Sequence, residues 1–234
     1  MAHSKAPVPV GSLSLEEALA LVPPALHPLT EGIQPRRVAR MVELLWDRLG
    51  SVVLVAEAVR RRHNVSAILR TADAFGLHEV HLVAGEFRPS HGASRGSERW
   101  LDVHRCPSPE ACLDDLRGRG FRVFVADLLP GALAPEEVPV DRPLALLFGS
   151  ELSGVSAAAR ARADGAVAVP MRGFVESLNV SVAAAIIARS AAERRRALRG
   201  PDLDPAARLA ALELWLRRED RYQAAAKRRT GRVS

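Results

Sequence analysis

The sequence has little cysteine, no long apolar run and no dinucleotide-binding glycine motif, and each of these absences excludes a class of protein. Its two cysteines, Cys106 and Cys112, lack cysteine or histidine neighbours at the spacing of a metal site, so we expect reduced thiols, no bound metal and a cytoplasmic protein. No apolar run approaches the ~20 residues that cross a bilayer. Residues 1–12 lack the apolar core of a signal peptide. No Gly-x-Gly-x-x-Gly follows an apolar run, which disfavours a dinucleotide enzyme.

Charge is distributed unevenly along the 234 residues, whose net charge is +6. Residues 189–234 contain 13 Lys or Arg against 6 acids, and residues 36–70 contain 8 Arg against 3 acids. The intervening residues 71–188 carry a net charge of −4. Two basic segments around a near-neutral body favour binding to a polyanion, because phosphate contacts supply most sequence-independent affinity. The same segments could instead be solvated, and the preference for Arg over Lys could reflect coding bias.

Short apolar runs alternate with helical patterns through the middle of the chain. The runs are residues 51–56, 79–83, 122–126, 144–148 and 165–169. Helical patterns cover residues 64–75, 109–119 and 155–162, and a further helix begins near Leu178. This alternation predicts an α/β fold with a mainly parallel sheet and helices on both faces.

The two ends of the chain have a different pattern. The first 35 residues are rich in proline and read as an arm with one short amphipathic helix over residues 13–22. Residues 36–49 and 205–223 have apolar positions at helical spacing, and the last eight residues are expected to be loose. We therefore expect an arm and basic helix over residues 1–50, a central domain over 51–199, and a basic helical extension over 200–234.

Residues 169–185, VPMRGFVESLNVSVAAA, form the most informative segment. A strand-like run ends at Pro170, and a turn leads through polar residues into a helix rich in Ala and Ile. Ser177 is the predicted N-cap of that helix. Such a segment exposes backbone amides and short polar side chains at a strand-to-helix crossing, where α/β proteins bind ligands. The same sequence pattern would also be found in an ordinary capped helix that binds no ligand.

Two further segments, HNVSAILRTADAFG over residues 63–76 and LALLFGSELSGVS over residues 144–156, precede it. The three segments resemble, in order and spacing, the three motifs of the SPOUT-class ribose methyltransferases, specifically the TrmH-like branch. The resemblance covers about residues 52–199. It implies methylation of a ribose 2'-hydroxyl in structured RNA with S-adenosyl-L-methionine as cofactor. It also implies a deep trefoil knot between Leu144 and the helix that begins near Leu178, and a homodimer that forms beside the knot.

The resemblance assigns catalytic roles to five polar residues. Arg70 is the principal catalytic residue and Asn64 positions it, while Glu151 orders the active-site loop and Ser177 and Asn179 position RNA. Each of the last four could instead serve only as a helix cap. The resemblance also implies that backbone positions enclose the adenosyl group of the cofactor, at Leu147, Gly149, Val169, Met171 and Leu178.

Arg70 follows two apolar residues in its helical turn, Ile68 and Leu69. An unpaired guanidinium is costly to bury, so this group must reach solvent or meet an anion. Because a guanidinium pKa lies above about 12, a neutral arginine acting as general base is scarce. We therefore expect Arg70 to hold the adjacent phosphate and to stabilise the developing alkoxide, with the proton leaving to that phosphate or to water.

RNA contacts are predicted at two arginine clusters, one before the first motif helix and one near the end of the third. These are Arg60, Arg61, Arg62, Arg194, Arg195 and Arg196. Phosphate binding is the functional interpretation. Arginines near a helix C-terminus are also favoured by the helix dipole alone.

The substrate is predicted from residues 203–218, LDPAARLAALELWLRR, which resemble the C-terminal extension of the tRNA D-loop enzymes. This resemblance favours guanosine 18 of tRNA as the nucleotide that is methylated. The alternatives are 2'-O-methylation of ribosomal RNA and a non-catalytic RNA-binding protein on the same fold. A hydrolase is disfavoured: Gly-x-Ser-x-Gly occurs at residues 92–96, but the preceding strand is expected to end near Val83, whereas a nucleophile elbow follows its strand directly.

Overall fold

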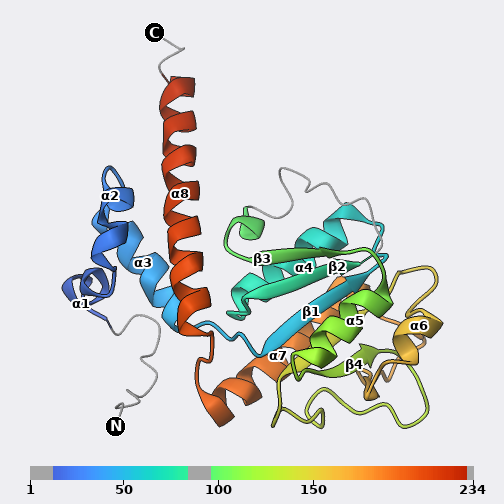
Figure 1. The fold of residues 1–234 in the computed structure, drawn as a ribbon. Coiled ribbons are helices and arrows are strands. Elements are labelled where there is room, and N and C mark those ends of the chain that lie inside the picture. The colour runs from blue at the N-terminus through green and yellow to red at the C-terminus, as the bar shows by residue number, and fades with distance from the viewer. Residues whose placement is uncertain (1–12, 84–95, 231–234) are drawn as a thin grey trace. The chain divides into compact units, whose positions relative to one another are not determined.

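The computed structural model describes residues 13–83 and 96–230, which form two compact units (Figure 1). One unit is built from the chain before Leu49 together with the chain after Gly200, and the other is residues 49–200. The Gly-x-Ser-x-Gly segment falls almost wholly outside the described residues. Within these ranges no helix is both long enough and apolar enough to span a membrane.

The larger unit contains a six-stranded sheet in the order β3-β2-β1-β5-β4-β6, with every neighbouring pair parallel. The strands are β1 (Val52–Glu57), β2 (Glu79–Val83), β3 (Asp102–Cys106), β4 (Arg122–Ala126), β5 (Leu144–Phe148) and β6 (Gly165–Val167). The predicted parallel sheet is confirmed, but β3 was missed. Its sequence, DVHRC, is largely polar because it is an edge strand that stays partly exposed.

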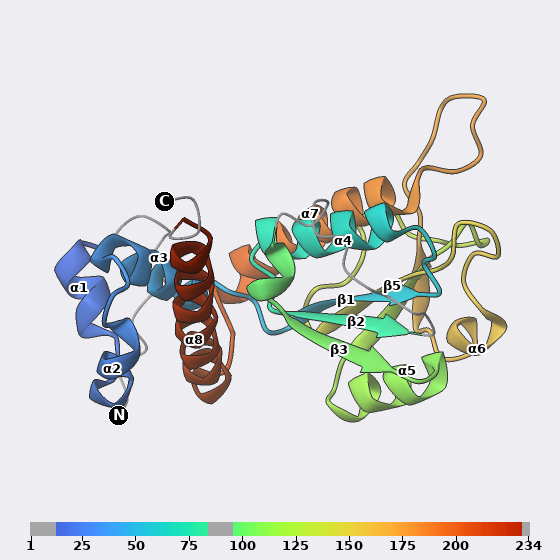
Figure 2. The ribbon, with the colours of Figure 1, turned by 90° about the horizontal axis from the view of Figure 1, so that it is seen from above.

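Helices cover both faces of this sheet, as the alternating pattern predicted. They are α4 (Arg62–Ala74), α5 (Pro109–Gly118), α6 (Ala157–Arg160) and α7 (Val180–Arg199), with the short 3-10 turn η2 (Ser97–Arg99) before β3. Figure 2 shows α4 and α7 side by side on one face, with α5 and α6 on the other. Gly76, with a φ of 70°, follows the last turn of α4 and ends it, as expected of a C′ glycine.

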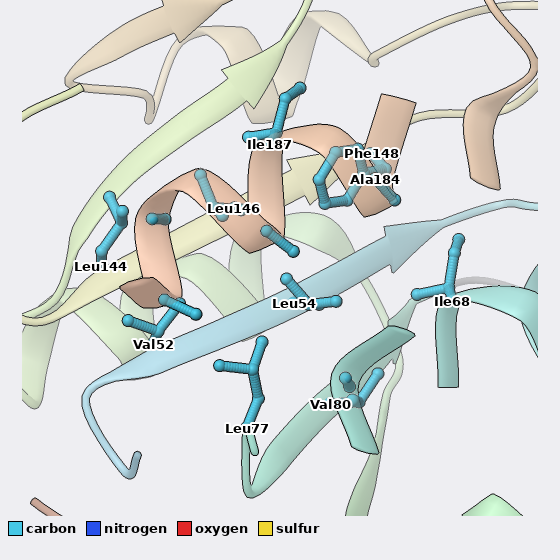
Figure 3. Close-up of a cluster of buried hydrophobic side chains, with 14 of the residues drawn as sticks. Val52, Leu54, Ile68, Leu77, Val80, Leu144, Leu146, Phe148, Ala184 and Ile187 are labelled. Carbon is cyan, nitrogen blue, oxygen red and sulfur yellow. The ribbon is translucent and has the colours of Figure 1, made fainter. Parts of the chain in front are cut away.

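The strand side chains alternate between two hydrophobic clusters, one on each face. Leu54 of β1 and Leu146 of β5 point toward α7, where they pack with Ala184 and Ile187 (Figure 3). Val53 and its neighbours at alternate positions join the cluster beneath α5 and α6. Each fully buried aliphatic side chain contributes roughly 1.5–3 kcal/mol relative to exposure. Because helices cover both faces of the sheet, side chains on both sides of β1 and β5 are apolar. These continuous apolar runs made the two strands predictable from the sequence.

The smaller unit is helical and combines the two ends of the chain. Its elements are α1 (Leu15–Ala20), the 3-10 turn η1 (Pro24–Leu26), α2 (His27–Thr30), α3 (Pro35–Trp46) and α8 (Pro205–Thr230). Ser14 and Glu17 form a capping box at the start of α1. The guanidinium of Arg48 lies 5.0 Å from the ring centroid of Trp215 on α8. The expectation of a loose end is wrong for residues 227–230, which belong to α8; residues 231–234 lie outside the described ranges.

Candidate active site

A cavity of about 520 Å³ opens at the carboxyl ends of three strands. Ala126 of β4, Phe148 of β5 and Val167 of β6, each the last residue of its strand, line its floor together with the start of α7. Open parallel sheets bind ligands at this edge. The volume lies in the range of sites that hold a cofactor-sized molecule.

The loop after β5 is a tight turn that forms one wall of the cavity. Ser150 and Gly154 exchange two backbone hydrogen bonds, of 3.0 and 2.9 Å. A Cβ atom on Gly149 would collide with the backbone of Gly154 and Val155, so the close approach requires glycine at 149. Gly154 has a φ of 65°, in the left-handed region that favours glycine. The turn holds Glu151 at the rim of the cavity.

Three of the predicted catalytic residues meet in one chain of hydrogen bonds. The buried Asn64 donates through Nδ2 to Oε1 of Glu151 at 2.5 Å. Its Oδ1 accepts a hydrogen bond from Nδ2 of Asn179 at 3.2 Å. This network joins α4, the β5 loop and the start of α7, the three segments that the sequence singled out.

Hydrogen bonding keeps the Glu151 carboxylate ionised. Burial would raise the pKa of this carboxyl. Backbone N–H groups of Glu151 itself, Arg60 and Arg61, together with the Asn64 amide, outweigh burial, and the pKa falls below its ordinary value. The rim of the cavity therefore carries a fixed negative charge at neutral pH.

Ser177 was predicted as the N-cap of α7 but does not cap it, and of the three residues for which capping was the alternative, only Asn179 is an N-cap. Arg61 precedes α4 and Asn64 is the third residue of the helix, which frees its amide for Glu151. Ser177 lies in the exposed loop that lines the cavity, whereas Asn179 caps α7 by accepting the Ser181 amide at 2.9 Å. Glu151 does not cap α6, whose N-cap is Ser156.

Arg70 is not part of this network. It lies six residues after Asn64 on α4, is exposed to solvent and does not line the cavity. Within the described ranges of the chain its guanidinium makes no hydrogen bond or ion pair. Its catalytic role therefore stays a prediction.

Most of the positions expected to enclose the cofactor line the cavity. Gly149, Val169, Met171 and Leu178 do so. Leu147 does not: its side chain is fully buried in the cluster under α5 and α6. The lining of apolar side chains and strand-end backbone fits an adenosyl group, which needs an apolar slot and main-chain polar groups more than charged partners.

Residues 51–189, which contain all three motif segments, match the SpoU rRNA Methylase family. The chain belongs to the SpoU methylase family.

Its relatives are RNA-modifying enzymes. A tRNA (guanosine(18)-2'-O)-methyltransferase of Thermus thermophilus is 40% identical over 196 residues, 81% of this chain and 100% of that protein. The solved structure of the Aquifex aeolicus TrmH/SpoU tRNA modifying enzyme matches with a TM-score of 0.72 at 31% identity, covering 79% of this chain and 96% of that one. An AdoMet-bound rRNA methyltransferase from Sinorhizobium meliloti matches with a TM-score of 0.58 at 25% identity, covering 63% and 58%.

The two arginine clusters of this SpoU protein differ in accessibility. Arg60, Arg61 and Arg62 are exposed, and Arg61 lines the cavity. In the other cluster the guanidinium groups bond to groups of the protein itself, and the RNA-binding role of this cluster stays a prediction. Arg195 is buried and donates to Ser51 Oγ and Val140 O. Arg194 donates to Pro135 O and Val138 O, and Arg196 donates to Phe75 O.

Sequence reasoning missed Asp127, a second carboxylate at the SpoU cavity. It directly follows β4, lines the cavity and forms an ion pair of 2.6 Å with Arg160. An acid immediately after a predicted strand was a usable signal. This signal places Asp127 at the cavity only once the strand order is known, because that order puts the end of β4 beside the ends of β5 and β6.

Proposed function

We propose that this protein transfers a methyl group from S-adenosyl-L-methionine to the 2'-hydroxyl of guanosine 18 in tRNA. The observation that carries the proposal is the Asn64–Glu151–Asn179 network at the rim of the cavity. Family membership and a match to the full length of the Thermus enzyme support the same reaction and substrate.

The cavity provides the cofactor site in this proposal. Val169, Met171 and Leu178 would hold the adenosyl group against the strand ends, and Gly149 lets the backbone approach it. When bound, the cofactor supplies an electrophilic methyl group on a sulfonium centre. The Asn64–Glu151 bond keeps the β5 loop in place while the negative charge of Glu151 faces the site.

Arg70 supplies the positive charge that the reaction needs. Deprotonating a ribose hydroxyl develops an alkoxide beside a phosphate; a guanidinium can bind the phosphate in forked geometry and donate a hydrogen bond to the alkoxide. The exposure of Arg70, without an ion pair in the described part of the chain, leaves its charge available for this contact. The proton leaves to the phosphate or to water.

A homodimer is part of the proposal. On the solvent side of α7, Val182 and Ile186 expose 46% and 39% of their surface, an apolar strip that a second copy would cover. Arg70 is an exposed residue of α4, the helix that packs beside α7 (Figure 2). A partner packed here would bring its own surface to Arg70.

The deep trefoil knot of the SPOUT class is also proposed. The β5 strand is inserted between β1 and β4, and α7 returns to cover the central strands β1 and β5. The C-terminal segments of the unit thus end at its middle, the arrangement that threading through a loop would require.

The test is methyl transfer from radiolabelled cofactor to unmodified tRNA, with the modified nucleotide mapped. We expect one methyl group at guanosine 18, and a kcat that falls by about 10²–10³ in Arg70→Ala. Arg162→Ala, on the α5 and α6 side of the sheet, is the matched control and keeps its activity.

The outcomes separate the competing functions. Transfer to 23S rRNA fragments and none to tRNA would redirect the proposal to ribosomal RNA, the substrate named for the Sinorhizobium structure. RNA binding with no transfer and no calorimetric heat from S-adenosylhomocysteine would leave an RNA-binding protein. An Arg70→Lys variant with native turnover and RNA affinity would remove the forked phosphate contact from the mechanism.

A further inference from the structure

A row of polar side chains lies on the α5 side of β2 and β3, where the pattern of the sheet calls for apolar ones. Residues of β2 alternate, so Glu79 and His81 share a face with Val83, which packs in the cluster under α5. The parallel register pairs His81 with His104 and Val83 with Cys106. The proposed methyl transfer uses none of these groups.

Three ligating atoms converge beneath α5. His81 Nδ1, Cys106 Sγ and Cys112 Sγ all lie within 4.8 Å of one another. The Cys106 sulfur is 3.5 Å from Nδ1 of His81. The three residues come from β2, from the last position of β3 and from α5. His81 and Cys112 are only 3% and 2% exposed.

The histidine ring is oriented to present a lone pair to the two sulfurs. Its other nitrogen, Nε2, lies 2.6 Å from Oε1 of Glu79. That carboxylate is itself held by Arg119, which donates to both of its oxygens at 2.7 Å. Nε2 therefore carries the proton that the carboxylate accepts, and Nδ1 is free to ligate. A carboxylate that orients a ligating histidine in this way is the usual outer partner of a protein metal site.

We propose that His81, Cys106 and Cys112 bind a thiophilic divalent metal ion of the zinc type, with water as an exchangeable fourth ligand. Adjacent ligand atoms of a tetrahedral zinc site with two thiolates and one imidazole are roughly 3.5–3.8 Å apart. The Cys106–His81 separation already matches, and side-chain rotation closes the remaining gaps. On binding, each thiol loses its proton to solvent and ligates as thiolate.

The site would fasten the edge of the sheet. β3 is paired on one side only, with β2, and the short turn η2 precedes it. A metal held by β2, β3 and α5 links this edge strand to the helix that covers it. The contribution is to stability, which makes it independent of methyl transfer.

The test uses the full chain, stripped of metal and kept reduced with a phosphine. Cobalt(II) replaces zinc and reports its own ligands: thiolates give a near-ultraviolet charge-transfer band, and tetrahedral geometry gives intense visible bands. We expect both at one equivalent per chain, bleached by zinc, with zinc in large excess raising Tm by roughly 5 °C.

Variants locate the ion. Cys106→Ser and Cys112→Ser each weaken the charge-transfer band, and His81→Gln lowers the intensity of the visible bands. His104→Gln is the matched control: it removes the histidine stacked on His81, at 4.9 Å between ring centroids, yet keeps full binding.

The wild-type spectrum decides the question even if a variant misfolds. Weak octahedral bands without a charge-transfer band at saturating cobalt would overturn the proposal, as would an unchanged spectrum in the Cys106→Ser, Cys112→Ser double variant. A reduced wild-type chain that binds no metal, but forms a Cys106–Cys112 disulfide on oxidation, would overturn it in favour of a thiol pair.

Discussion

At the scale of the residue, Asn64 links three segments of the chain through one buried amide. Its donor and acceptor are both used, one by Glu151 and the other by Asn179. An amide fits because it is neutral and offers both functions, whereas a carboxylate in its place would face Glu151 with a like charge. The position within the first turn of α4 is what turns this side chain inward.

Asn64→Ala removes both bonds and leaves Glu151 and Asn179 without their partner. We expect a loss of about 1–3 kcal/mol in the free energy of unfolding, measured by urea denaturation. Asn64→Asp should lose more at about pH 8 than at about pH 5, because protonating one of two adjacent carboxylates relieves their repulsion.

The alanine variant is the control for this pH dependence. Asn64→Ala removes only one of the hydrogen bonds that lower the pKa of Glu151 and adds no second carboxylate, so its loss should change less between the two pH values than the loss in Asn64→Asp. Equal losses at the two pH values in Asn64→Asp would show that the two side chains do not interact.

At the scale of the element, the turn after β5 depends on one glycine. Backbone atoms of Gly154 and Val155 occupy the space that a Cβ atom on Gly149 would need. The turn carries Glu151 and forms a wall of the cavity, so its geometry links the end of a strand to the cofactor site. The pattern Gly-Ser-Glu-Leu-Ser-Gly in the sequence already indicated a tight turn here.

Gly149→Ala should force this turn open. We expect a drop of at least about tenfold in affinity for S-adenosylhomocysteine by calorimetry, equivalent to about 1.4 kcal/mol, together with a lower Tm. Gly173→Ala is the matched control, because no atom outside its immediate neighbours lies within 4 Å of its added Cβ and its φ is not in the left-handed region. Indistinguishable affinities of the two variants would contradict the role of the close contact.

At the scale of the whole molecule, distant parts of the chain combine. The N-terminal arm and the C-terminal extension, expected as separate segments, form one unit. Within it α3 packs on α8, and Arg37 pairs with Glu219 at 3.3 Å. In the larger unit, α7 buries Ala184 and Ile187 against the sheet and leaves Ile186 facing solvent. That solvent side is the surface proposed for a second copy.

Ile186→Glu should convert a dimer into a monomer, because it places a charge in the centre of the proposed contact. Sedimentation velocity measures the change. Leu209→Glu serves as control, since this leucine of α8 is similarly exposed, at 41%, and belongs to the smaller unit. A wild-type chain that sediments as a monomer at all concentrations would refute the dimer.

Local patterns determined much of this protein. The apolar runs of β1, β2, β4 and β5 and the helices between them follow from side chains a few residues apart, and the sequence predicted them within one or two residues. β3 escaped because an edge strand buries little and so needs no apolar run. Each of the three motif segments is likewise a continuous stretch of the chain, which its own residues make recognisable.

Only the tertiary structure decided which side chains meet. Asn64 and Glu151 are 87 residues apart in sequence, and Asn64 and Asn179 are 115 apart. Arg195 was expected at a surface, yet packing directs it inward to Ser51. The convergence of His81 with the two cysteines has the same origin. Such long-range contacts depend on strand order and helix packing. These arise from the burial of side chains that are far apart in the sequence, and so they produce no periodic pattern in the sequence.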